Sequence, residues 1–148
     1  MKFGVYTPFL PDVFSLLKEV GARSIELACW AGTYTDADVM LTDSARYEEV
    51  ISTITSNRLE ISALGYYPNN LDPDINRREA NNKYLMRLIE LADRMGVRIV
   101  STFAGRVLDK DIPDNIPIFK EVFTPIIKYA EDKGVKIAIE NCPMMHGF

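Results

Sequence analysis

The sequence has little of what several classes of protein require. Its 148 residues include only two cysteines, Cys29 and Cys142, which lie far apart and without a CxxC spacing. A disulfide scaffold is therefore not expected, and the cysteine content fits a reduced cytosolic protein. The chain also has no long run of Lys or Arg, and its formal net charge is -4. Because neutralising the phosphates of a nucleic acid needs clustered positive charge, we expect no nucleic-acid partner.

The beginning of the sequence lacks a basic segment followed by a long apolar stretch. Residues 1–5 lead directly into a strand-like pattern, so we expect no signal peptide, no membrane helix, no membrane partner and a cytoplasmic location. What the chain does have is a hydrophobic content of 47%, which is enough for a substantial core. We expect residues 1–148 to form one domain, or part of a larger one.

Four times along the chain, an amphipathic helical stretch stops at a helix-ending residue and a short β-type run begins. The helix-ending residues are Gly21, Asn57, Gly96 and Gly134, at successive steps of 36, 39 and 38 residues. A near-constant period indicates one repeated supersecondary unit, here a strand followed by a crossover helix. Such units make the strands parallel and place each strand-to-helix loop at the carboxyl edge of the sheet, where α/β proteins bind ligands.

The pattern predicts five strands and four helices. We expect strands at residues 3–6, 24–28, 60–64, 98–103 and 136–139, and helices at about 12–20, 44–56, 76–95 and 115–133. Two architectures have five such strands. One is a complete doubly wound domain; the other is the first part of an eight-unit barrel, which at this period has about 300 residues.

Side-chain alternation in two strands favours the barrel. A doubly wound sheet lies between two helical layers, so both of its faces should be bulky and apolar. Here one face of the second and fifth strands is bulky (Ile25 and Leu27; Ile137 and Ile139), and the other is small or polar (Ser24, Glu26 and Ala28; Lys136, Ala138 and Glu140). We therefore predict an α/β fold of parallel (β/α) units, the first five strands and four helices of a TIM (β/α)8 barrel.

Glu140 is the sharpest candidate for chemistry. It follows the apolar run 135–139 at the predicted carboxyl end of the fifth strand, with open loops ahead of it. Metal ligands and general acid or base groups of barrel enzymes occupy this position. The alternative is a strand-end carboxylate that caps a turn or pairs with a lysine.

Several segments together resemble a known superfamily. The chain is similar to the xylose-isomerase-like TIM-barrel superfamily, and most similar to its sugar phosphate isomerase/epimerase proteins. The similarity covers essentially the whole chain but only the first five of the family's eight strands. The segments that carry it are 4–7, 21–27, 91–97, 102–106 and 134–141, the last reading Gly-Val-Lys-Ile-Ala-Ile-Glu-Asn.

The resemblance implies a metal-dependent sugar or sugar-phosphate isomerase or epimerase that acts by proton transfer through an enediolate. In that family a carboxylate from the fifth strand holds a divalent metal together with Asp, His and Glu residues of later strands. Glu140 matches the first of these ligands and would serve as both metal ligand and proton acceptor. The other ligands have no counterpart, so this chain alone should be inactive. An oxygen-rich site suits Mn²⁺ or Mg²⁺, and assembly into a homo-oligomer stays open.

Other side chains are expected around this position. Glu26 should share a face with Glu140; an unpaired carboxylate there is costly, so it is structural, tied to a lysine or arginine, or part of the site floor, and we favour the structural role. Aromatic residues at or just beyond strand ends suit stacking on a sugar, although ordinary packing explains them equally well. They are Tyr6, Phe9, Trp30, Tyr66 and Phe103.

Two further residues complete the predicted substrate site. Arg106, after the fourth strand, would clamp a phosphate or carboxylate, or is simply solvated. His146, the only histidine, lies where ketose 3-epimerases carry a substrate-contacting carboxylate, so it departs from the pattern. The absence of earlier histidines argues against the DNA-repair branch of the superfamily, which binds zinc through them. The competing hypothesis is a complete five-stranded doubly wound binding or regulatory domain without catalysis.

Overall fold

The computed structural model describes residues 3–142, which form one five-stranded parallel sheet. The strands pair in sequence order, β1 with β2, β2 with β3, β3 with β4 and β4 with β5. Their bounds are Gly4–Thr7 for β1, Ser24–Ala28 for β2, Glu60–Gly65 for β3, Ile99–Phe103 for β4 and Lys136–Glu140 for β5. Each lies within a residue or two of its predicted position.

Helices connect these strands as the repeated unit predicts, with one addition. The bounds are Pro11–Glu19 for α1, Ala37–Thr42 for α2, Ser44–Ser56 for α3, Ile75–Met95 for α4 and Ile112–Asp132 for α5. The short α2 was not predicted, because it lies inside the long loop after β2. It begins at Asp36, whose side chain accepts a hydrogen bond from the backbone N–H of Asp38 at 2.9 Å.

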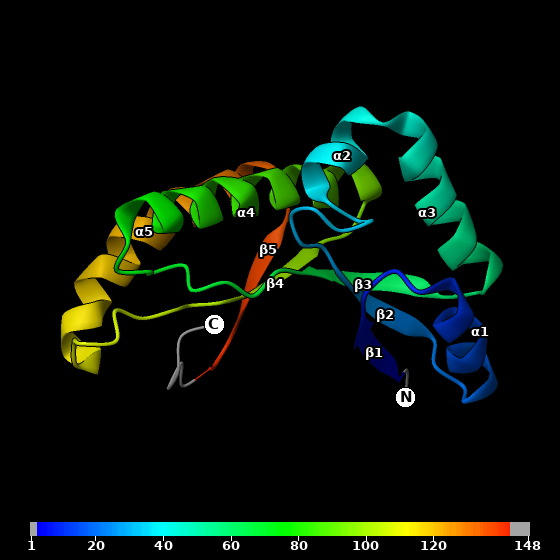
Figure 1. The fold of residues 1–148 in the computed structure, drawn as a ribbon, viewed down its shortest axis with the longest axis horizontal. Helices are drawn as coiled ribbons and strands as arrows, with labels where there is room; N and C mark the ends of the chain where they lie inside the picture. Colours follow the sequence, from blue (N-terminus) through cyan, green and yellow to red (C-terminus); the bar gives the residue numbers. More distant parts are fainter. Residues whose placement is uncertain (1–2, 143–148) are drawn as a thin grey trace.

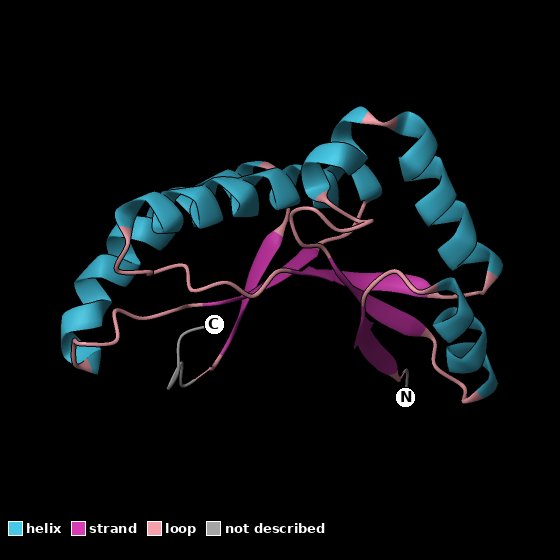
Figure 2. Cartoon of the chain, viewed as in Figure 1, coloured by secondary structure: helices cyan, strands magenta, loops and turns pink. Residues whose placement is uncertain are grey.

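The sheet is covered on one face only. Figure 1 shows the helices following the convex side of the curved sheet, and Figure 2 shows no described helix across the concave side. A doubly wound sheet has helices on both faces and a strand order that reverses. Consecutive pairing with one helical layer is instead the arrangement of a TIM barrel, so the predicted fold class is confirmed and the doubly wound alternative is wrong.

Strand residues alternate between the two faces, as the sequence predicts. Ile25, Leu27, Leu64 and Val100 are fully buried beneath the helices. Burial of one such side chain contributes about 1.5–3 kcal/mol. The other face carries Glu26 and, by register, the residues beside it: Tyr6 pairs with Glu26, and Phe103 pairs with Glu140. No helix of the described part is long and apolar enough to cross a membrane.

The four helix-to-strand junctions share a left-handed backbone. Gly21, Gly96 and Gly134 have φ angles of 83°, 68° and 65°. At the second junction the left-handed residue is Arg58, with φ 58°, directly after the predicted Asn57. A residue with a Cβ atom is disfavoured there by about 1–2 kcal/mol.

We expect Arg58→Gly to raise the free energy of unfolding by about 0.5–1 kcal/mol, because the strain at φ 58° is relieved and glycine's extra chain entropy offsets only part of it. Urea unfolding followed by circular dichroism measures the change. Arg58→Ala is the control, since it removes the exposed side chain but keeps the strain, and it should leave stability nearly unchanged. Equal stabilisation by both variants would contradict this explanation.

Candidate functional site

The carboxyl ends of all five strands border one cavity. Its volume is about 450 Å³, within the usual range of roughly 300–1,000 Å³ for small-molecule sites. Each strand contributes one side chain to its lining, at the strand end or just after it. The lining residues are Tyr6, Trp30, Tyr67, Phe103 and Glu140. The structure therefore brings together four residues that the sequence singled out and adds Tyr67.

Aromatic rings of this cavity contact one another, edge to face for Tyr6 with Tyr67 and tilted for Tyr67 with Phe103. The Tyr6 and Tyr67 ring centroids are 5.5 Å apart with an interplanar angle of 76°, and those of Tyr67 and Phe103 are 4.8 Å apart. Trp30 Nε1 donates a hydrogen bond to Tyr6 Oη at 3.3 Å. The result is an apolar wall beside the single carboxylate of Glu140, with Tyr6 still 46% exposed.

Tyr67 joins the two carboxylates of the concave face. Its hydroxyl is within hydrogen-bond distance of Glu26 Oε1, and it lies 2.9 Å from Glu140 Oε1. Partial burial and then these two hydrogen bonds raise the pKa of Tyr67, so its hydroxyl stays protonated at neutral pH. Glu26 and Glu140 thus lie on the same face of the sheet, and both contact the hydroxyl of Tyr67.

The partner of Glu26 differs from the basic residue considered from the sequence. Among the described residues no Lys or Arg forms an ion pair with Glu26, and its carboxylate accepts from Tyr67 instead. Gly65 makes room for this contact. A Cβ atom at Gly65 would lie 2.5 Å from Glu26 Oε1 and 2.8 Å from Tyr6 Cε2.

Tyr66 and Phe9 do not line the cavity. Tyr66 is 5% exposed and packs against Tyr84, with ring centroids 4.7 Å apart. Phe9 stacks on Tyr34 at 5.0 Å, nearly parallel. Substrate contact by either residue stays a prediction, now without support from its position.

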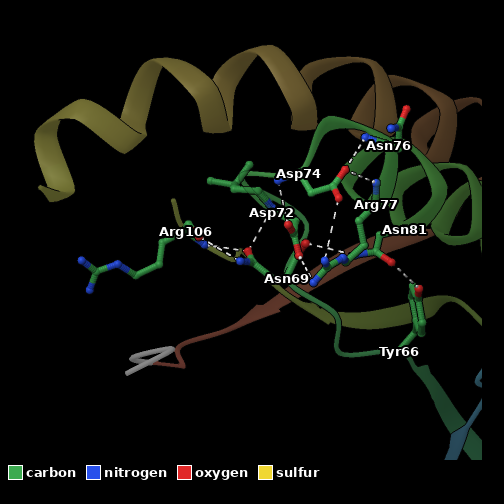
Figure 3. Close-up of polar contacts among 9 residues, drawn as sticks. Tyr66, Asn69, Asp72, Asp74, Asn76, Arg77, Asn81 and Arg106 are labelled. Atoms are coloured by element: carbon green, nitrogen blue, oxygen red, sulfur yellow. Dashed lines mark hydrogen bonds and ion pairs between the residues drawn. The ribbon is translucent and has the colours of Figure 1, made fainter. Parts of the chain in front are cut away.

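Arg106 lies beside a second cavity of about 320 Å³, which Glu140 also lines. Its Nη2 donates to the carbonyl oxygens of Leu108 and Lys110 at 3.3 and 3.2 Å. In Figure 3 the Arg106 side chain points away from Asn69, whereas the backbone N–H of Arg106 donates a hydrogen bond to Asn69 Oδ1. The guanidinium therefore holds its own loop, and its proposed role as an anion clamp stays untested. His146 lies outside the described residues.

An asparagine connects the loops that follow β3 and β4. Asn69 Oδ1 accepts from the backbone N–H of Arg106 at 2.9 Å, and Asn69 Nδ2 donates to the carbonyl oxygen of Arg106 at 2.9 Å. Asn81 of α4 donates from Nδ2 to the carbonyl oxygen of Asn69 and accepts from the hydroxyl of Tyr66 (Figure 3). These bonds fix the loop that carries Tyr67 against the loop that follows Phe103.

The donor set does not form a complete metal site. Within residues 3–142, no three His, Cys, Asp or Glu side chains come together in a way that could hold a metal ion. Glu140 offers carboxylate oxygens, which suit Mg²⁺ or Mn²⁺. A full coordination sphere would need ligands from outside the described residues.

A family model described as xylose isomerase-like TIM barrel matches residues 14–148. A comparison with curated proteins found no match.

Solved structures share the fold at low sequence identity. D-psicose 3-epimerase with D-tagatose from Clostridium cellulolyticum H10 is 16% identical, with a TM-score of 0.71, and the match covers 100% of this chain and 55% of that one. A probable 3-DHS dehydratase, AsbF, from Bacillus anthracis is 17% identical, with a TM-score of 0.70 and coverages of 97% and 53%. A xylose isomerase-like TIM barrel protein from Mycobacterium smegmatis in complex with magnesium is 22% identical, with a TM-score of 0.66 and coverages of 87% and 45%.

These structural similarities concern the fold alone. The chain spans about half the length of the relatives, 45–55% of these three. Five parallel strands with helices on one face, matched over about half of each relative, are consistent with part of a barrel.

We expect Gly105→Ala to destabilise the chain by about 2–4 kcal/mol. Gly105 has φ 81°, and a Cβ atom would lie 2.2 Å from Asn69 Oδ1 and 2.7 Å from the backbone nitrogen of Asn70, so strain and overpacking add. Gly32→Ala is the matched control, with φ 75° and nothing within 4 Å, and should cost only about 1 kcal/mol. Thermal and urea unfolding measure both. Equal losses would show that the close approach to Asn69 is unimportant.

Proposed function

Because this chain belongs to the xylose isomerase-like TIM barrel family, we propose that it is part of a metal-dependent sugar or sugar-phosphate isomerase or epimerase. The observation that carries the proposal is the position of Glu140, at the end of β5 in a cavity walled by aromatic rings. A carboxylate beside an apolar wall can take a proton from a bound sugar while water is kept away.

The proposed reaction is a proton transfer next to a carbonyl group. The Glu140 carboxylate would remove a proton from the ketose carbon beside the carbonyl, leaving an enediolate. Return of a proton to the neighbouring carbon gives an isomer, and return to the opposite face of the same carbon gives an epimer. Return to the opposite face requires a second acid on that side, which we propose comes from a part of the barrel outside residues 3–142.

The aromatic wall supports a sugar as the substrate class. Rings of Tyr6, Trp30 and Phe103 would contact the C–H face of a ketose, while Glu140 would accept hydrogen bonds from its hydroxyl groups. D-Tagatose, bound in one structural relative, is a suitable probe. Arg106 and His146 remain candidates for contacts with a charged group of the substrate.

A divalent cation, Mn²⁺ or Mg²⁺, is the cofactor proposed for the complete site. Glu140 would supply one oxygen ligand, and the remaining ligands would come from outside the described residues. For this reason we propose that the 148-residue chain binds a sugar but does not turn it over, and that its location is cytoplasmic.

We expect D-tagatose to change the fluorescence of Trp30, the only tryptophan in the chain. Glu140→Gln should weaken binding about 10- to 100-fold, because the lost hydrogen bonds involve a charged acceptor worth about 1.5–3 kcal/mol. A fluorescence titration gives both affinities. Glu19→Gln, an exposed carboxylate on α1, is the charge-matched control and should bind as the unchanged chain does. Unaltered affinity in Glu140→Gln would refute the proposed role.

The chain alone, with Mn²⁺ added, should not exchange the sugar's carbon-bound hydrogen with heavy water, because residues 3–142 hold no complete metal site and, we propose, no second proton-transfer group. Proton NMR of D-tagatose detects such exchange directly. Exchange that disappears in Glu140→Gln would show instead that this chain is itself catalytic.

A further inference from the structure

The oxygen atom of Tyr67 has three oxygen neighbours. Two are carboxylate oxygens, Glu26 Oε1 and Glu140 Oε1, and the third is the hydroxyl of Ser101. Ser101 lies on β4 and is 5% exposed. Its hydrogen bond lowers the pKa of Tyr67, against the larger effects of burial and the two carboxylates.

One hydroxyl group serves two carboxylates. Tyr67 has a single hydroxyl hydrogen, and Glu26 Oε1 and Glu140 Oε1 are both within hydrogen-bond distance of its oxygen. Glu26 and Glu140 therefore compete for one donor. At any moment one carboxylate is hydrogen-bonded to Tyr67, and the other needs a donor from elsewhere.

The ring of Tyr67 is held in place while this competition occurs. Tyr6 and Phe103 contact its two sides, at centroid distances of 5.5 and 4.8 Å. Gly65 allows the close approach, since a Cβ atom there would lie 3.0 Å from Tyr67 Cε2. Only the hydroxyl hydrogen needs to turn for Tyr67 to change its acceptor.

We propose that Tyr67 is a positioning residue for Glu140, and that its hydroxyl hydrogen, which either carboxylate can accept in the ligand-free chain, turns to Glu26 alone when a hydroxyl group of a bound sugar donates to Glu140. The identity of the ligand rests on the proposed function; the shared hydrogen does not. After the turn each carboxylate has a donor, the sugar for Glu140 and Tyr67 for Glu26. No covalent bond forms or breaks, and no proton leaves Tyr67.

This role would explain why a carboxylate is present at Glu26 despite the free-energy cost of its desolvation. A carboxylate on the concave face, without a basic partner among the described residues, needs a hydrogen bond to offset its desolvation. As the alternative acceptor, Glu26 lets Glu140 exchange a protein donor for a ligand donor without leaving Tyr67 unpaired. The two carboxylates are then coupled through one hydroxyl group.

Carbon-13 NMR of labelled glutamate side-chain carboxyl groups tests the coupling, in the 148-residue chain without added metal. Loss of one signal in Glu26→Gln and of another in Glu140→Gln assigns the two resonances. Without ligand, Glu140→Gln should shift the Glu26 signal when Tyr67 is present. The same substitution should leave the Glu26 signal in place when Tyr67 is replaced by phenylalanine. Added D-tagatose should move both signals in the unchanged chain and only the Glu140 signal in Tyr67→Phe.

Tyr129→Phe is the matched control, because it removes a tyrosine hydroxyl that donates to a carboxylate, Glu90 at 2.7 Å, away from the residues that line the cavity. In this variant both signals should still move with D-tagatose. The proposal is overturned if Glu140→Gln shifts the Glu26 signal equally with and without the Tyr67 hydroxyl. If D-tagatose moves neither signal, the proposed function fails, and the ligand-free comparison still decides the role of Tyr67.

Discussion

Side chains of a β-strand alternate between two faces, and within residues 3–142 helices cover one of these faces and leave the other open. The covered face holds the apolar side chains that stabilise the fold, including Ile25 and Leu27. The other face is left for residues that do not contribute to that core. Because the strands are parallel and in sequence order, their carboxyl ends meet at one edge, and Glu26 and Glu140 come within reach of one tyrosine.

The sequence was sufficient to predict the positions of the strands, because each strand depends on a local pattern of side chains. The β2 bounds agree at both ends, and the shared face of Glu26 and Glu140 follows from a period of two residues. The helix α2 was missed since its six residues lie in a long loop and carry no repeat of their own.

Within the site, the cavity lining differs from the residues singled out in the sequence where a shift of one residue decides the face of the strand. Tyr66 was chosen and Tyr67 was overlooked, although the alternation Ala63, Gly65, Tyr67 continues the concave face beyond the end of β3. Which of two neighbouring tyrosines faces the cavity cannot be decided until the register at the end of the strand is known. Arg106 stays a predicted substrate contact, although backbone carbonyl groups of its own loop, which a sequence does not show, accept hydrogen bonds from its guanidinium.

The left-handed turn at each helix-to-strand junction is a feature of the backbone rather than of one amino acid. Three junctions use glycine, whereas the second uses Arg58 with a similar φ angle. The same backbone direction is thus reached with different amino acids. Ancestry by duplication of a βα segment, if it underlies the repeat, would leave its clearest trace in the torsion angles of these connections.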